Sequence, residues 1–171
     1  YIIYTTLHRN PVSTKTLTIL FTDLANYTSS IRDKKRKEVR ELIQQHEEMV
    51  CSTLIDKGGH LVKSIGDSYL FTFTSATDAL NSGIDLINNL STDDQMNIKI
   101  GIATGDVEDI DNDYFGDAVN MASRIVSMAL PNEIWFSQST FLSMKVSEVP
   151  FELIGLFDLK GFLGKHQLFR A

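Results

Sequence analysis

The sequence predicts an α+β fold with a ferredoxin-like core, in which the elements follow the order β-α-β-β-α-β and extra strands and a helix come after them. Three observations support this prediction. Short segments in which apolar and polar residues alternate indicate strands. Two longer segments repeat apolar residues at three- and four-residue steps and indicate helices. A glycine-containing pair between two apolar runs indicates a hairpin.

The first strand and the first helix come from the N-terminal third of the chain. Apolar residues alternate with polar ones over Leu17–Phe21, as on a half-buried strand. The apolar repeat of residues 39–54 predicts a helix, which Gly58 and Gly59 end. The basic run 34–37 is followed directly by acidic residues, so we interpret it as the solvated start of this helix.

The rest of the core follows from three shorter patterns. Residues 60–73 indicate a hairpin with a two-residue turn of the Gly-X kind at 66–67. Ser75-Ala76-Thr77-Asp78 resembles a capping box and predicts a helix that runs to Leu90. Isoleucines that alternate over 98–102 predict the strand that completes the core.

The C-terminal third is expected to add elements to this core. Residues 106–115 are acidic and irregular in pattern, which is typical of a loop, and Pro131 closes off the helix that follows them. The expected elements are a helix over 116–128, a strand over 133–137, a short helix over 139–144 and strands over 151–160 and 165–169.

The composition is typical of a soluble globular domain. The chain has 171 residues, of which 43% are apolar, enough for one well-buried domain. The net charge of −6 argues against binding of nucleic acid, whose phosphates need a basic footprint. No apolar run approaches the roughly 20 residues that span a bilayer. The single cysteine, Cys51, suits a reducing, cytoplasmic compartment.

The chain starts at Tyr1 rather than Met, so we expect a domain excised from a longer protein. Residues 1–15 are assigned to a lead-in segment, and residues 16–171 to the folded domain.

Two aspartates stand where a strand gives way to a turn. Asp23 ends the first strand, and Asp67 lies at the tip of the hairpin. Carboxylates held at two strand ends are able to share hard cations, and Mg²⁺ prefers few carboxylates together with phosphate oxygens. The alternative is that both are ordinary turn formers, as turn aspartates usually are.

The segments around these aspartates resemble the motifs of one family, the class III nucleotide cyclases. Five segments match in family order and cover nearly the whole chain from about Leu17 onwards. They are Phe21–Thr28 and Lys63–Asp67 for the two metal motifs, Ile100–Gly105, Asp113–Arg124 for the transition-state helix with the strand end before it, and Leu159–Gly161. The chain thus resembles the catalytic domain of a class III adenylyl cyclase.

The resemblance implies a site for two divalent cations, Mg²⁺ or Mn²⁺. Asp23 and Asp67 would bridge them, and the carbonyl of Leu24 would be a third protein ligand. Cations held there would lower the pKa of the ribose 3′-hydroxyl and clamp the β- and γ-phosphates of the substrate.

The residues after Leu24 are expected to bind phosphate. A helix should begin near Asn26, Tyr27 and Thr28, and the backbone N–H groups of this turn would cradle phosphate oxygens. Asn26 stands where the commonest family pattern has Gly. Asn also tolerates left-handed backbone geometry, so the turn is expected to be kept.

Asn120 and Arg124 are four residues apart on a predicted helix and therefore share a face. By the resemblance, Asn120 orients the ribose and Arg124 stabilises the pentavalent phosphorus, a role that suits a forked and permanently charged guanidinium. The alternative for Arg124 is an ion pair with a nearby carboxylate such as Asp117. Lys160 would contact the triphosphate by the same resemblance.

The choice of base is assigned to Lys63 and Asp113. Adenine offers an acceptor at N1 and a donor at N6, so a lysine donor and an aspartate acceptor complement it. Guanylyl members of the family typically place Glu where Lys63 stands. A site that leaves a polar partner unmatched discriminates strongly, so this pair favours ATP.

The resemblance implies adenylyl cyclase activity, ATP to 3′,5′-cyclic AMP and pyrophosphate, in a head-to-tail homodimer. One protomer would supply Asp23 and Asp67, the other Lys63, Asp113, Asn120, Arg124 and Lys160, with an upstream sensor setting the dimer geometry. The alternatives are a guanylyl cyclase, which Lys63 and Asp113 oppose; a diguanylate cyclase, whose Gly-Gly-(Asp/Glu)-Glu-Phe segment is missing; or a non-catalytic nucleotide-binding or dimerisation module.

Overall fold

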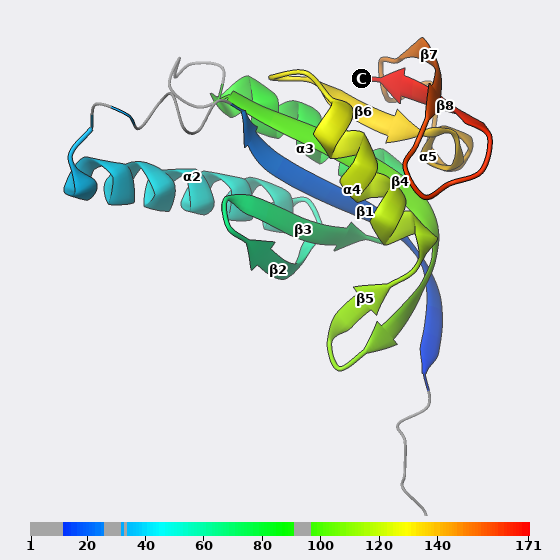
Figure 1. Cartoon of the computed structure of the whole chain (residues 1–171), viewed down its shortest axis with the longest axis horizontal. Coiled ribbons are helices and arrows are strands. Elements are labelled where there is room, and N and C mark those ends of the chain that lie inside the picture. The colour runs from blue at the N-terminus through cyan, green and yellow to red at the C-terminus, as the bar shows by residue number, and fades with distance from the viewer. Residues whose placement is uncertain (1–11, 26–31, 33, 91–96) are drawn as a thin grey trace, which may run out of the picture.

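The computed structural model describes residues 12–25, 32, 34–90 and 97–171, and its elements form one mixed sheet with helices on both faces (Figure 1). Within these residues the elements are β1 (Ser13–Ala25), α2 (Arg36–Asp56), β2 (His60–Ile65), β3 (Ser68–Phe73), α3 (Ala76–Leu90), β4 (Asn97–Ile110), β5 (Asp113–Phe115), α4 (Asp117–Met128), β6 (Ile134–Ser137), α5 (Gln138–Ser143), β7 (Glu152–Asp158) and β8 (Lys165–Arg170).

The predicted ferredoxin-like core is confirmed. β1 lies between β3 and β4 and pairs antiparallel with both, while β2 pairs with the outer side of β3. The chain reaches β2 from β1 through α2, and β4 from β3 through α3, as this arrangement requires. Gly66 and Asp67 join β2 to β3, and Gly66 has the positive φ, 65°, of a tight hairpin turn.

The predicted C-terminal extension is also present. β6 lies beside β4 and runs parallel to it, which requires a crossover connection, and α4 provides one. β8 pairs antiparallel with β6, and β7 pairs antiparallel with β8 and forms the other edge of the sheet. In the described part of the chain, no helix is both long and apolar enough to cross a membrane.

The prediction of a loop over residues 106–115 was wrong. β4 continues to Ile110, and β5 folds back on it as a short hairpin that projects from the body of the sheet in Figure 1. Asp111 and Asn112 form its turn, with φ values of 53° and 63°. Asp and Asn tolerate this left-handed geometry, so an acidic segment without apolar alternation still forms a hairpin.

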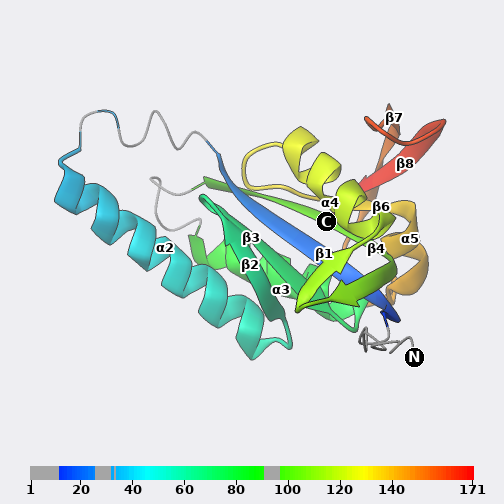
Figure 2. The same cartoon turned by 60° about the horizontal axis from the view of Figure 1, so that its bottom comes forward.

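β1 is longer and more buried than expected. It begins at Ser13, so residues 13–15, which we assigned to the lead-in, belong to the sheet. Leu20 packs on the side of α2 and α3, whereas Ile19 and Phe21 pack on the side of α4. Figure 2 shows these helices on opposite faces of the sheet. The strand is therefore buried on both faces rather than half-buried.

His46 lies on the buried face of α2, and its side chain has no hydrogen-bond partner among the described residues. It is 2% exposed, and its ring centroid lies 6.0 Å from that of Tyr69 on β3. Burial lowers its pKa from 6.5 to about 4, because the apolar surroundings disfavour the charged imidazolium.

His46 is expected to make the fold acid-sensitive. Its folded pKa lies below its unfolded value, so its contribution is complete above about pH 6.5 and is lost as the pH falls towards 4, where the unfolded chain alone binds the proton. The free energy of unfolding should fall by about 3 kcal/mol over this range. Urea titrations from pH 7 to pH 4 should show this fall in the wild type and a smaller one in His46→Phe. Equal falls in both proteins would contradict the assignment.

Candidate active site

Asp23 lies near the end of β1, on the face of the sheet that α4 covers, because it keeps the alternation of Ile19 and Phe21. Ser68 Oγ donates a hydrogen bond to Asp23 Oδ1 over 2.8 Å. Lys99 Nζ lies 3.6 Å from Asp23 Oδ2. Each oxygen of the carboxylate is thus next to one polar group, and the carboxylate is held in a defined orientation.

Asp67 occupies the β2–β3 turn, as expected, and directly precedes Ser68. The Ser68–Asp23 hydrogen bond therefore fixes the turn that carries Asp67 beside the end of β1. Neither aspartate is buried. Asp67 thus lies in a turn and is followed directly by the serine that contacts Asp23, and both carboxylates are accessible, as the metal prediction requires.

The donors at this place fit a hard divalent cation. A cation held by Asp23 and Asp67 would have two carboxylates and would complete its shell with other oxygens. Mg²⁺ has this preference. Among the described residues, no group of three or more His, Cys, Asp or Glu side chains is placed to hold a metal ion. Leu24 packs its side chain against the α2–α3 cluster, which leaves its backbone carbonyl as the one group that it offers.

Lys63 and Asp113 contact each other. Lys63 Nζ donates to Asp113 Oδ2 over 2.6 Å, and both side chains are partly exposed. The hydrogen bond from Lys63, with a smaller one from the Tyr114 N–H, lowers the pKa of Asp113. The pair therefore holds a donor and an acceptor side by side.

A β-bulge directs Lys63 toward this contact. The pairing of β2 with β3 shifts register between Leu61 and Lys63, so that Lys63 lies opposite Leu70 and on the same face as Asp23. Bulges commonly re-aim a side chain in this way. Asp113 approaches from β5, the strand that the sequence did not predict.

Asn120 and Arg124 share the exposed face of α4. The opposite face of the helix is buried against β4, where a Cβ atom at Gly101 would lie only 2.3 Å from the backbone nitrogen of Val126. Arg124 has no ion-pair partner among the described residues, so the alternative pairing with Asp117 is not seen.

Lys160 is exposed after the end of β7. Its neighbour Leu159 is buried in the same cluster as Ile125 of α4, which anchors this loop on the α4 face. The other substrate-binding residues that we predicted, Asn26, Tyr27 and Thr28, lie outside the described residues.

Two residues of this site were missed in the sequence. Ser68 and Lys99 both contact Asp23, yet neither forms part of a recognisable motif. The available signals were indirect: Ser68 follows Asp67, and Lys99 becomes the cross-strand neighbour of Asp23 once β1 and β4 are paired.

Known sequences resemble this chain over most of its length. Residues 10–170 match the family described as "Adenylate and Guanylate cyclase catalytic domain". An adenylate cyclase from Streptomyces coelicolor is 33% identical over 114 residues, 66% of this chain and 30% of that protein. One from Streptomyces griseus is 34% identical over 112 residues, 65% of this chain and 28% of that protein. The chain thus spans about a third of the length of these relatives.

Solved structures share the fold over almost the whole chain. The catalytic core of a rhodopsin-guanylyl cyclase with converted specificity, in complex with ATPαS, has a TM-score of 0.83 at 27% identity and covers 92% of this chain and 97% of its own. The adenylyl cyclase CyaB from P. aeruginosa also has a TM-score of 0.83, at 22% identity, and covers 93% of this chain and 94% of its own. The chain belongs to the adenylate and guanylate cyclase catalytic domain family, the class III nucleotide cyclases.

Proposed function

We propose that this domain is an adenylyl cyclase, which converts ATP to 3′,5′-cyclic AMP and pyrophosphate. The observation that carries the choice of base is the contact between Lys63 Nζ and Asp113 Oδ2 at 2.6 Å. A lysine that faces N1 and an aspartate that faces N6 complement adenine. Guanine has the reverse polarity, a donor at N1 and an acceptor at O6, and would need the two groups in exchanged places. The named adenylate cyclases among the relatives support the same substrate.

The chemistry is an in-line attack of the ribose 3′-oxygen on the α-phosphorus, with pyrophosphate as the leaving group. Asp23 and Asp67 would hold the divalent cations, Mg²⁺ or Mn²⁺, which supply Lewis-acid activation of the hydroxyl and charge stabilisation. Such a reaction asks the protein mainly for positioning and electrostatics. Before a cation binds, Lys99 offsets the charge of Asp23.

The remaining residues act on the nucleotide itself. Asn120 orients the ribose, and Arg124, four residues further on the same exposed face of α4, forks to the oxygens of the pentavalent phosphorus. Lys160 binds the triphosphate. Asn26, Tyr27 and Thr28 offer backbone N–H groups to phosphate oxygens.

We place the complete site between two protomers in a head-to-tail homodimer. One protomer supplies the two aspartates, and its partner supplies the base-binding pair, Asn120, Arg124 and Lys160. A regulatory domain upstream in the full-length protein would then act by changing the alignment of the two protomers.

Nucleotide preference tests the proposal. The purified domain should convert ATP at least tenfold more efficiently than GTP in the presence of Mn²⁺, because an unmatched polar partner in the base pocket is costly. Lys63→Glu combined with Asp113→Asn replaces the donor by an acceptor and the acceptor by a group that can donate, so this preference should fall or reverse. Cyclic products measured by chromatography decide. GTP preference in the wild type would indicate a guanylyl cyclase, and metal-dependent nucleotide binding without product would indicate a non-catalytic module.

Complementation tests the shared site. Asp23→Ala and Arg124→Ala should each reduce kcat by about 100-fold or more, since each removes a group that stabilises the transition state. Their mixture should regain up to about one quarter of wild-type activity, because a mixed dimer keeps one intact site. The control is each variant mixed with itself at the same total concentration. No recovery in a mixture that forms heterodimers would contradict sharing.

Ser68 is expected to position Asp23 for metal binding. Ser68→Ala removes the 2.8 Å hydrogen bond to Asp23 and should weaken Mn²⁺ affinity about tenfold, as loss of a group that orients a ligand commonly does. Electron paramagnetic resonance of free Mn²⁺ measures this without turnover. Ser64→Ala, an exposed serine of the same hairpin, is the matched control. Equal affinity in Ser68→Ala and the wild type would exclude the positioning role.

A further inference from the structure

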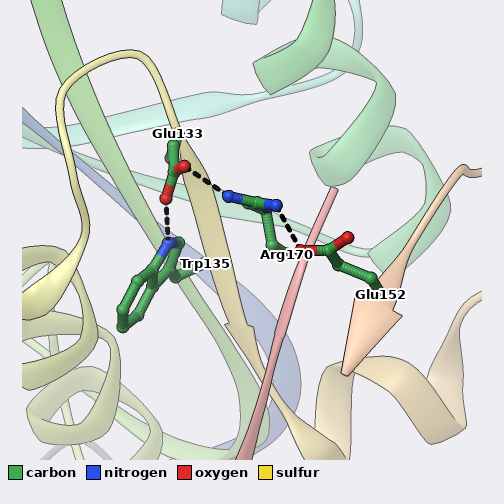
Figure 3. A network of polar contacts seen from close by, with 4 residues as sticks. All are labelled: Glu133, Trp135, Glu152 and Arg170. Carbon is green, nitrogen blue, oxygen red and sulfur yellow. Dashed lines mark hydrogen bonds and ion pairs between the residues drawn. The ribbon is translucent and has the colours of Figure 1, made fainter. Parts of the chain in front are cut away.

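A network of polar contacts joins three C-terminal strands on the side of α4. Glu133 Oε2 accepts a hydrogen bond from Trp135 Nε1 over 2.6 Å, and Glu133 Oε1 accepts one from Arg170 Nη1 over 2.6 Å. Arg170 Nη2 in turn contacts Glu152 of β7. Figure 3 shows the four side chains in one chain of contacts, with the carboxylate of Glu133 between the indole and the guanidinium.

Through this network the indole of Trp135 is fixed from two directions. Its nitrogen is tied to Glu133, and its ring lies 5.6 Å from that of Phe157, centroid to centroid. Trp135 as a whole is 8% exposed. Arg170 cannot lose its charge at physiological pH, so it remains a permanent support for Glu133.

Two large side chains flank the contact between α4 and the sheet, Phe21 from β1 and Trp135 from β6. Trp135 is the one that the network holds. It is the cross-strand partner of Gly101, the residue on which the backbone of α4 rests. A glycine surface offers no side chain to stop the helix from sliding along β4. The indole fills the adjacent space and packs in one cluster with Ile125, the residue that follows Arg124.

We infer that Glu133, Trp135 and Arg170 form a positioning device for Arg124, and hence for the charge that α4 presents to the reacting phosphorus. The inference rests on the proposed function. None of the three residues is placed in contact with the nucleotide. They act by fixing the place of α4, whose misplacement by about 1 Å would cost on the order of 100-fold in rate.

The kinetic test uses Glu133→Ala, which leaves the indole and the guanidinium without their shared acceptor. We expect kcat to fall about tenfold and KM for ATP to change less than about twofold, because Arg124 acts in the transition state. In an Arg124→Ala background the same substitution should cost less than about twofold. Glu148→Gln, which removes an exposed carboxylate paired with Lys145, is the matched control and should leave both constants unchanged.

Two milder variants keep the test decisive if Glu133→Ala unfolds. Trp135→Phe keeps an aromatic ring but loses the donor, and it should lower kcat at least threefold. Glu133→Gln keeps an acceptor for the indole, so it should retain more activity than Glu133→Ala or Trp135→Phe. Trp135 is the single tryptophan, so its fluorescence reports the environment of the ring directly. Emission should shift in Glu133→Ala and much less in Glu133→Gln.

The outcomes separate this inference from the proposed function. Turnover of neither ATP nor GTP by the wild type would remove the proposed function, and this inference with it. An active wild type whose Glu133 and Trp135 variants keep kcat within twofold would overturn the inference alone. An equal fall of kcat with and without Arg124 would also overturn it, because the network would then act on stability and not through that residue.

Discussion

The contact between α4 and Gly101 is the constraint on which the functional face depends. A Cβ atom at this position would meet the helix backbone at 2.3 Å, so only glycine lets α4 lie directly on β4. This close approach buries Ala122 and Ile125 and turns the opposite side of the helix, with Asn120 and Arg124, toward solvent. Backbone contact of this kind fixes the height of α4 above the sheet and leaves its lateral position to the neighbouring side chains.

The charged groups of the site neutralise one another in the free protein. Asp23 lies beside Lys99, and Asp113 beside Lys63. Both pairs are partly exposed, so their attraction is screened and adds little to stability. Their value is in orientation: each carboxylate is held in one direction, and under the proposed function a cation or a base would replace its present partner. Arg124, in contrast, has no such partner among the described residues, and under the proposed function its guanidinium would pair with phosphate oxygens.

Much of this could be predicted from the sequence, and the failures have identifiable causes. The β2–β3 turn was predictable because a Gly-X pair between two apolar runs is typical of a hairpin, and Gly66 has the positive φ that such a turn needs. The ferredoxin-like order of elements followed from the periodicity of apolar residues. The β-bulge that re-aims Lys63 could not be predicted. One extra residue in a short strand only shifts the alternation of apolar and polar residues by one position, and the sequence alone does not show that this shift is a bulge.

The burial of β1 on both faces could not be predicted from the sequence for a related reason. Thr18 and Thr22 are polar in composition, yet they are 2% and 1% exposed, since helices cover both sides of the sheet. Alternation of polar and apolar residues predicts a solvated face only where nothing packs on it. Lys99 was missed because its role depends on pairing with Asp23 across two strands that are far apart in sequence.

β4 links the two parts of the site within one protomer. Lys99, beside the carboxylate of Asp23, and Gly101, beneath α4, are two residues apart and lie on the same face of this strand. A shift of β4 along its axis would therefore move Lys99 and the side chain of Asp23 beside it, and it would move Arg124 through Trp135 and the other side chains that couple α4 to the sheet. If the proposed dimer completes each site across the interface, Asp23 and Arg124 of one protomer belong to different sites. The rigidity of one strand then becomes a way for occupancy of one site to affect the geometry of the other.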